Sequence, residues 1–225
     1  MKKLLDSPYV GWAAILSGVV DLLGFVFLIL FYTLEAPQIL QSGEPSTPPL
    51  FGTLNDASFI FVALFIVPVA LALHKQEQAQ APTLSWIALI IGMIGMLATA
   101  TVQALYVPRV ISTAQQSPLL SIGIGTIGLW MLLVNLLGRR GTGLPSRLGW
   151  LGIAVGVSLI LMPVTYFAGG GSALLSDSSS SLSNPLVIIG FAIATLGLVV
   201  VYPVWAILVG RLFLRRQVGD PELES

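Results

Sequence analysis

The sequence predicts an all-α membrane protein, a bundle of six transmembrane helices with both termini in the cytoplasm. Three observations lead to this fold class: the composition, six long apolar runs, and the distribution of lysine and arginine between those runs. Of the 225 residues, 56% are hydrophobic and 9% are charged, whereas a soluble domain carries about 25% charged residues. A water-soluble fold of this length could not cover so much apolar surface.

Six segments are long and apolar enough to cross a bilayer, which takes roughly 20 predominantly apolar residues. Backbone polar groups in lipid must find partners within the protein, so we expect helices and not strands. The segments are Val10–Leu34, Asn55–Leu73, Leu84–Tyr106, Leu119–Leu137, Leu148–Ala168 and Leu186–Gly210. The first follows Lys2 and Lys3 as a signal peptide does, but its apolar run well exceeds the roughly 7–15 residues of a cleavable one. We therefore expect an uncleaved first span.

Basic residues are confined almost entirely to alternate gaps between the spans. Nine of the ten fall there, namely Lys2, Lys3, Lys75, Arg139, Arg140, Arg147, Arg211, Arg215 and Arg216, and the tenth is Arg109 between spans three and four. Cytoplasmic loops carry an excess of lysine and arginine. The pattern therefore predicts cytoplasmic N- and C-termini, a single domain over residues 1–216, and a short polar cytoplasmic tail over 217–225.

Span one carries Asp21, an acid with apolar residues for several turns on both sides. An ionised carboxylate is costly there, so an intramembrane acid is by default a candidate proton relay, cation site or substrate contact. Ser158 of span five and Tyr202 of span six come to about the same depth, and we predict them as hydrogen-bond donors in a polar site with Asp21. The alternative is a structural carboxyl that is protonated, or hydrogen-bonded to another helix, and fixes the packing.

The other spans carry features of packing more than of chemistry. Asn55 and Asp56 stand at the start of span two, and we expect them to cap its free amide groups. Thr99 and Gln103 lie in the outer half of span three, where interhelical hydrogen bonds or interfacial water would satisfy them. Prolines inside spans two, five and six predict kinks; they are Pro68, Pro163 and Pro203. Small residues recur at helix-packing spacing, as in Gly92–Gly95 and Gly152–Gly156, and favour a compact bundle.

Several function classes lack the residues they need. Ten acidic residues balance ten basic residues, which offers no basic patch for a nucleic acid. The chain has no cysteine and one histidine, His74 at the end of span two. Thiolate, bis-histidine and membrane-embedded serine–histidine sites are therefore unsupported, and so is a pair of intramembrane carboxylates. We expect no enzyme activity, no cofactor and no metal.

Several loop and interface segments carry a family resemblance. They are FGTLND at Phe51–Asp56, LALHK at Leu71–Lys75, GLPSRLGWLG at Gly143–Gly152, YPVW at Tyr202–Trp205, and Gly210-Arg211. With these, nearly the whole chain resembles a group of uncharacterised six-span bacterial integral membrane proteins, of the domain-of-unknown-function kind. The resemblance implies the plasma (inner) membrane of a bacterium. It brings no activity, ligand or catalytic residue.

Two functional hypotheses follow. The first is a non-enzymatic accessory or interaction protein, in contact with the lipid bilayer and with a membrane-protein partner or further copies of itself, because packing signals outnumber chemical ones. The alternative is a small-solute or proton-coupled transporter with Asp21 at its centre and the proline-bearing spans as moving parts.

Overall fold

The computed structural model describes residues 8–42, 49–140, 144–170 and 185–218, and every regular element in these ranges is a helix. In chain order the elements are α2 (Tyr9–Leu30), the π-helical turn η1 (Phe31–Glu35), α3 (Ala36–Ser42), α4 (Leu50–Glu77), α5 (Pro82–Tyr106), α6 (Thr113–Arg140), α7 (Ser146–Ala168), α9 (Pro185–Leu196), the π-helical turn η2 (Gly197–Val201) and α10 (Tyr202–Val218). Lys2, Lys3 and residues 219–225 of the predicted tail lie outside the described residues.

The described helices form six spans long and apolar enough to cross a membrane, which confirms the predicted fold class. Span one is α2 with η1 and most of α3, and span six is α9, η2 and α10 joined end to end. The helices extend past the apolar runs, because polar residues continue a helix beyond the hydrocarbon. Span two, for example, begins at Leu50 and not at Asn55, and it ends at Glu77 and not at Leu73.

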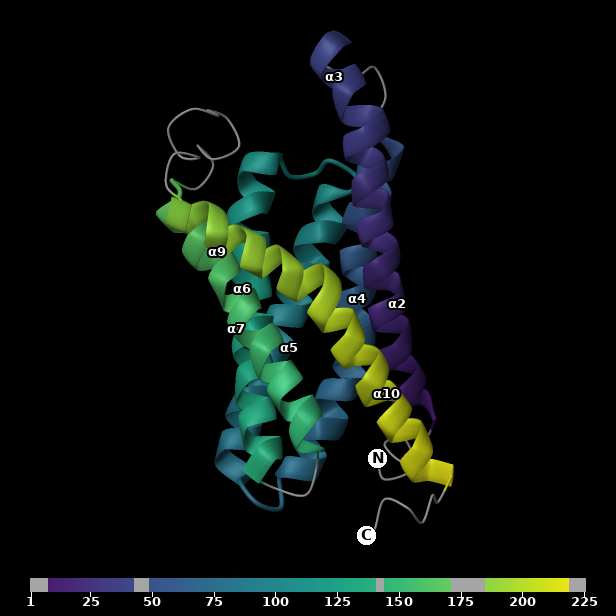
Figure 1. Ribbon diagram of the computed structural model, residues 1–225, viewed down its shortest axis with the longest axis vertical. Coiled ribbons are helices and arrows are strands. Elements are labelled where there is room, and N and C mark those ends of the chain that lie inside the picture. Colours follow the sequence, from purple (N-terminus) through teal and green to yellow (C-terminus); the bar gives the residue numbers. More distant parts are fainter. Residues whose placement is uncertain (1–7, 43–48, 141–143, 171–184, 219–225) are drawn as a thin grey trace.

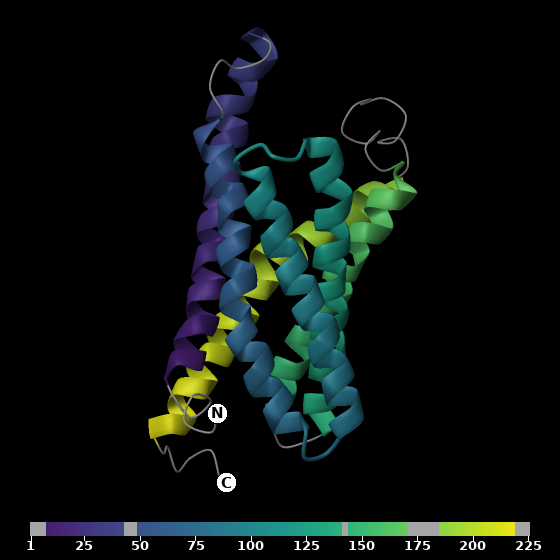
Figure 2. The same cartoon turned by 180° about the vertical axis from the view of Figure 1, so that it is seen from behind.

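Each span packs against the next one along the chain: α2 on α4, α4 on α5, α5 on α6, and α6 on α7. Span six closes the ring in two halves, since α9 packs on α7 while α10 packs on α2. It therefore runs diagonally across the bundle, as seen from the two sides in Figure 1 and Figure 2. This crossing brings the middle of span six against spans one and five together.

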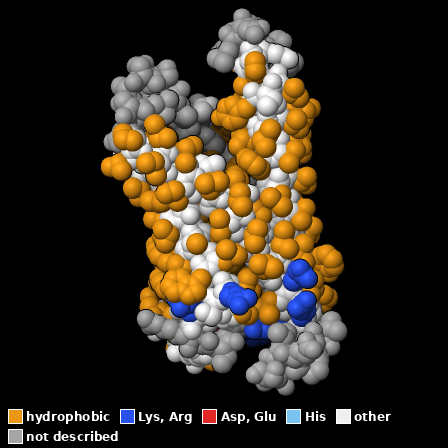
Figure 3. Space-filling view, in the orientation of Figure 1, with side chains coloured by type: hydrophobic (Ala, Val, Ile, Leu, Met, Phe, Trp, Pro, Cys, Tyr) orange, Lys and Arg blue, Asp and Glu red, His pale blue; other side chains and the backbone are white. Residues whose placement is uncertain are grey.

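The two ends of the bundle differ in charge. Helix α2 begins and helix α10 ends at the same end (Figure 1). That end, here named the basic end, carries Lys75, Arg139, Arg147, Arg211, Arg215 and Arg216, and Figure 3 shows basic side chains gathered there on one face. Arg109 lies in the connection between α5 and α6 at the opposite end, here named the Arg109 end. The membrane side that each end faces stays a prediction.

Small residues allow the helix backbones to approach closely, as predicted. A Cβ atom added to Gly156 of α7 would lie 2.6 Å from the backbone nitrogen of Leu132 in α6. One added to Gly18 of α2 would lie 2.8 Å from the carbonyl oxygen of Pro203 in α10. Real Cβ contacts are longer than this, so no larger residue fits without moving a helix.

Candidate functional site

Asp21 lies on the buried face of α2 together with Ser17 and Gly24, which are one turn away on either side. Only 5% of its surface is exposed, so it faces neighbouring helices and not lipid. Its Oδ2 atom is buried and has no hydrogen-bond partner among the described residues. Buried polar atoms in proteins are nearly always partnered, so this carboxyl stays a candidate functional group.

Ser17 connects Asp21's helix to two others. Its hydroxyl donates to the carbonyl oxygen of Val62 in α4 over 3.1 Å and lies 2.5 Å from the hydroxyl of Tyr202 in α10. A serine hydroxyl has one hydrogen. Because Val62 receives it, Tyr202 is the donor in the second bond. Ser17 is not among the site residues predicted from the sequence, although its place one turn before Asp21 puts both on one helix face.

Tyr202 owes its position to the break in span six. Pro203 has no backbone N–H, and its ring crowds the carbonyl group four residues earlier. The π-helical turn η2 ends immediately before Tyr202 and accommodates the disruption with a wider turn. Tyr202 is 3% exposed, and its hydroxyl is bonded to Ser17, which lies one turn from Asp21 on the same buried face of α2. The structure thus brings two of the three predicted site residues together.

Ser158, the third predicted residue, has a different set of contacts. Its hydroxyl donates to the carbonyl oxygen of Ala154 on its own helix over 2.8 Å. Its side chain also covers the backbone of Gly197 in η2, where an added Cβ atom would collide with it. Ser158 therefore serves the contact between α7 and span six, and no hydrogen bond of the described chain joins it to Asp21.

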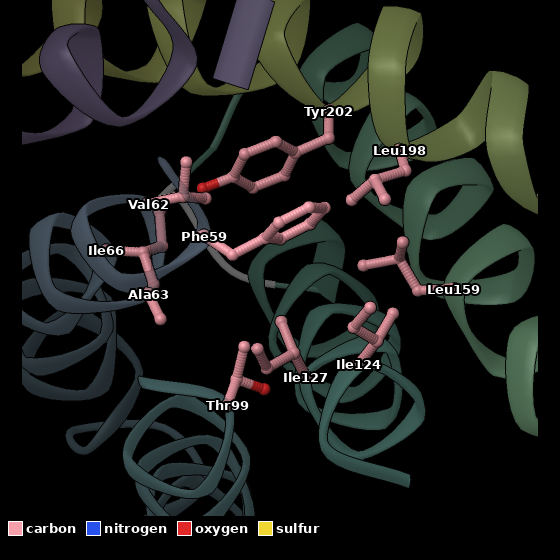
Figure 4. Close-up of a pocket in the computed structure, with 10 residues that line it drawn as sticks. All are labelled: Phe59, Val62, Ala63, Ile66, Thr99, Ile124, Ile127, Leu159, Leu198 and Tyr202. Atoms are coloured by element: carbon pink, nitrogen blue, oxygen red, sulfur yellow. The ribbon is translucent and has the colours of Figure 1, made fainter. Parts of the chain in front are cut away.

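A cavity of about 30 Å³ lies between α4, α5, α6, α7 and span six. Figure 4 shows Tyr202 and Phe59 on one side of it and Thr99 on the opposite side, with the hydroxyl of Tyr202 directed toward Val62. Neither Asp21 nor Ser158 lines this cavity. Its volume has room for water, which needs about 10–15 Å³, but its walls are almost wholly apolar.

A polar column extends from the cavity toward the Arg109 end. It consists of Thr99 and Gln103 on α5 with Gln116 and Ser121 on α6, all buried. Gln116 donates to Gln103 over 3.2 Å, as expected for interhelical satisfaction. However, Thr99 Oγ1, Gln103 Nε2 and Ser121 Oγ have no hydrogen-bond partner in the part of the chain that the structure describes. Of the interhelical hydrogen bonds expected for Thr99 and Gln103, the described residues show the one at the side-chain oxygen of Gln103.

The cap of span two differs from the prediction. Asn55 and Asp56 lie inside α4, which begins at Leu50, so they do not cap it. Instead Glu35 of η1 accepts hydrogen bonds from the amides of Phe51 at 3.1 Å and Gly52 at 3.3 Å. The prediction was wrong because apolar periodicity ends at Asn55, whereas the helix continues outward until a carboxylate from span one meets its free amides.

A serine and the histidine meet at the basic end. His74 Nδ1 lies 2.7 Å from Ser85 Oγ, and Ser85 donates to the carbonyl oxygen of His74 over 3.0 Å. The ring of Trp86 covers that of His74 at 4.5 Å. Because both polar side chains are buried and the hydroxyl proton is held by a backbone carbonyl, this pair joins α4 to α5 and does not present a free nucleophile.

Comparisons with protein-family models, with curated proteins and with solved structures found no match. The six-span family resemblance accordingly stays a prediction, while the multi-pass helical membrane fold stands on the structure itself.

Proposed function

We propose that the protein is a non-enzymatic accessory or interaction protein of the plasma (inner) membrane of a bacterium, with both termini cytoplasmic. It acts through contacts with a membrane-protein partner or with further copies of itself. The observation that supports this most is the close glycine packing between the spans.

The outer surface supports the same proposal. Large apolar side chains are exposed along all six spans, and on span one they include Leu22, Leu23, Val26 and Ile29. Such a surface suits lipid, and it equally suits the helix of another membrane protein, where packing and not water exclusion supplies the affinity.

Crosslinking in intact native membranes, followed by purification in mild detergent at native expression level, tests the interaction role. We expect one membrane protein, or a second copy of this chain, to be recovered at fixed stoichiometry. Recovery of the monomer with lipid alone would contradict the proposal.

A second candidate function is a proton-coupled carrier, and one observation favours it: the unpartnered Oδ2 of Asp21 beside the π-helical break of span six. Unwound or broken helices near the membrane midplane often form the sites of transporters. Loss of a proton flux from reconstituted vesicles on Asp21→Asn substitution, with the fold retained, would favour this candidate. Absence of any proton flux in the wild-type protein would rule out the carrier function.

A further inference from the structure

We propose that Asp21 is a reversible proton-binding site, reached from the Arg109 end of the bundle through the polar column, the cavity, Tyr202 and Ser17. This goes beyond the interaction role and does not depend on it.

The surroundings of Asp21 favour the neutral acid. Among the described residues, the titratable group that faces it is Tyr202 of α10. Helix α4 contributes the uncharged Val62 and Ser58 at this level, and its acid Asp56 has the charge of Arg109 as its electrostatic partner. With no cation opposite, an ionised carboxylate there would be uncompensated. A proton on the carboxyl would remove this uncompensated charge.

The packing around Asp21 leaves room for a proton but not for a larger ligand. Asp21 Oδ2 has essentially no accessible surface, so neither water nor a metal ion fits beside it in this conformation. A proton needs no such space. The carboxyl can gain or lose one if hydroxyl groups lead to it.

Two hydroxyl groups do lead to it. Tyr202 donates to Ser17, which is one turn from Asp21 on the same helix face. Tyr202 also lines the cavity, so its side chain connects the cavity with Ser17. In proton uptake Ser17 turns its hydrogen from Val62 to Asp21 and accepts the proton of Tyr202, which in turn accepts one from hydronium. Hydronium plus the carboxylate become water plus the carboxylic acid. Both hydroxyl groups end as they began.

The two halves of the bundle differ in how their buried polar groups are satisfied. Toward the Arg109 end, Thr99 Oγ1, Gln103 Nε2 and Ser121 Oγ are buried without a hydrogen-bond partner among the described residues, so they offer binding sites to water once the helices move apart. Toward the basic end the core holds fully buried large side chains, including Trp130, Trp205 and Met131, and the buried polar side chains of Asn135 and His74 there are hydrogen-bonded, to Trp205 and to Ser85. Water entering from the Arg109 end meets polar groups, whereas water entering from the basic end would have to displace this packing.

Infrared difference spectroscopy of the full chain in lipid nanodiscs tests the site. We expect the carbonyl band of a buried carboxylic acid, which Asp21→Asn removes and the control Glu35→Gln retains. A band that survives Asp21→Asn overturns the proposal. Where Asp21→Asn does not fold, Asp21→Glu takes its place, and an unshifted band then overturns it.

The rate at which that band shifts after transfer to D₂O tests the route, because the shift reports exchange of the carboxylic acid proton for deuterium. We expect Tyr202→Phe and Thr99→Val each to slow the exchange by about tenfold or more, since losing a positioned proton-transfer group costs at least this much. The controls Tyr32→Phe, at a residue 65% exposed, and Ser158→Ala are expected to exchange at the wild-type rate. Equal rates in all four variants overturn the route.

Discussion

The hydroxyl of Tyr202 lies 2.5 Å from Oγ of Ser17, across 185 positions of the sequence. This bond ties span six to span one at the level where span six changes from a π-helical to an α-helical turn. Because Ser17 also donates to Val62, a single serine joins three spans. The last span is thereby held on the first, which closes the bundle.

Tyr202→Phe removes the bond to Ser17 and leaves the ring in place. We expect the free energy of unfolding to fall by about 1 kcal/mol, because membrane hydrogen bonds between helices contribute about 0.6 kcal/mol on average and the Ser17 lone pair loses its donor. A thermal melt in detergent measures this. Tyr32→Phe, at an exposed tyrosine, is the control, and an equal loss there would show that the bond contributes nothing.

Gly156→Ala tests the contact between α7 and α6. The added methyl would lie 2.6 Å from the backbone nitrogen of Leu132, and overpacking of this kind costs about 1–3 kcal/mol. Gly138→Ala is the matched change, because its nearest neighbour is the flexible side chain of Leu144 at 3.2 Å. We expect a clear drop in melting temperature for the first variant and a small one for the second. The reverse order would contradict the described helix contact.

Glu35→Ala removes the carboxylate that receives the amides of Phe51 and Gly52. Loss of a cap costs about 1 kcal/mol, so we expect the melting temperature to fall. Asn55→Ala should have a smaller effect, since Asn55 lies inside α4. If Asn55→Ala lowers the melting temperature more than Glu35→Ala does, α4 begins at Asn55, as the sequence predicted, and not at Leu50.

The six spans could be predicted from the sequence, but the start of α4 and the contacts around Asp21 could not. A long apolar run indicates that its segment lies in lipid, so the spans and the membrane setting follow from the sequence. The start of α4 could not, because it depends on Glu35 from another span. The depth of Tyr202 could be counted from the helix end, but its direction depends on the π-helical turn. Ser158 has the correct depth, yet it faces Gly197, since depth says nothing of which way a helix is rotated.

Single cysteines test the orientation, and the natural chain has none to interfere. Val110→Cys lies in the exposed connection at the Arg109 end, and Ala79→Cys lies in the exposed connection between α4 and α5 at the basic end. We expect a membrane-impermeant maleimide to label the first variant in intact cells and the second only after lysis, as the excess of basic residues at the basic end predicts. The opposite labelling would invert the topology.

Asp21→Leu separates a structural carboxyl from a functional one. The Oδ2 atom of Asp21 has no partner among the described residues, so an apolar side chain of similar size removes an unpaired polar atom and breaks no hydrogen bond to that atom. We expect the melting temperature to stay the same or to rise, while Asp21→Asn, which brings an amide with two unpaired hydrogens, lowers it. A loss of stability of about 2 kcal/mol or more in Asp21→Leu would reveal a bond that fixes the packing. Stability retained without the acid would mean that the chain keeps Asp21 for a task other than folding.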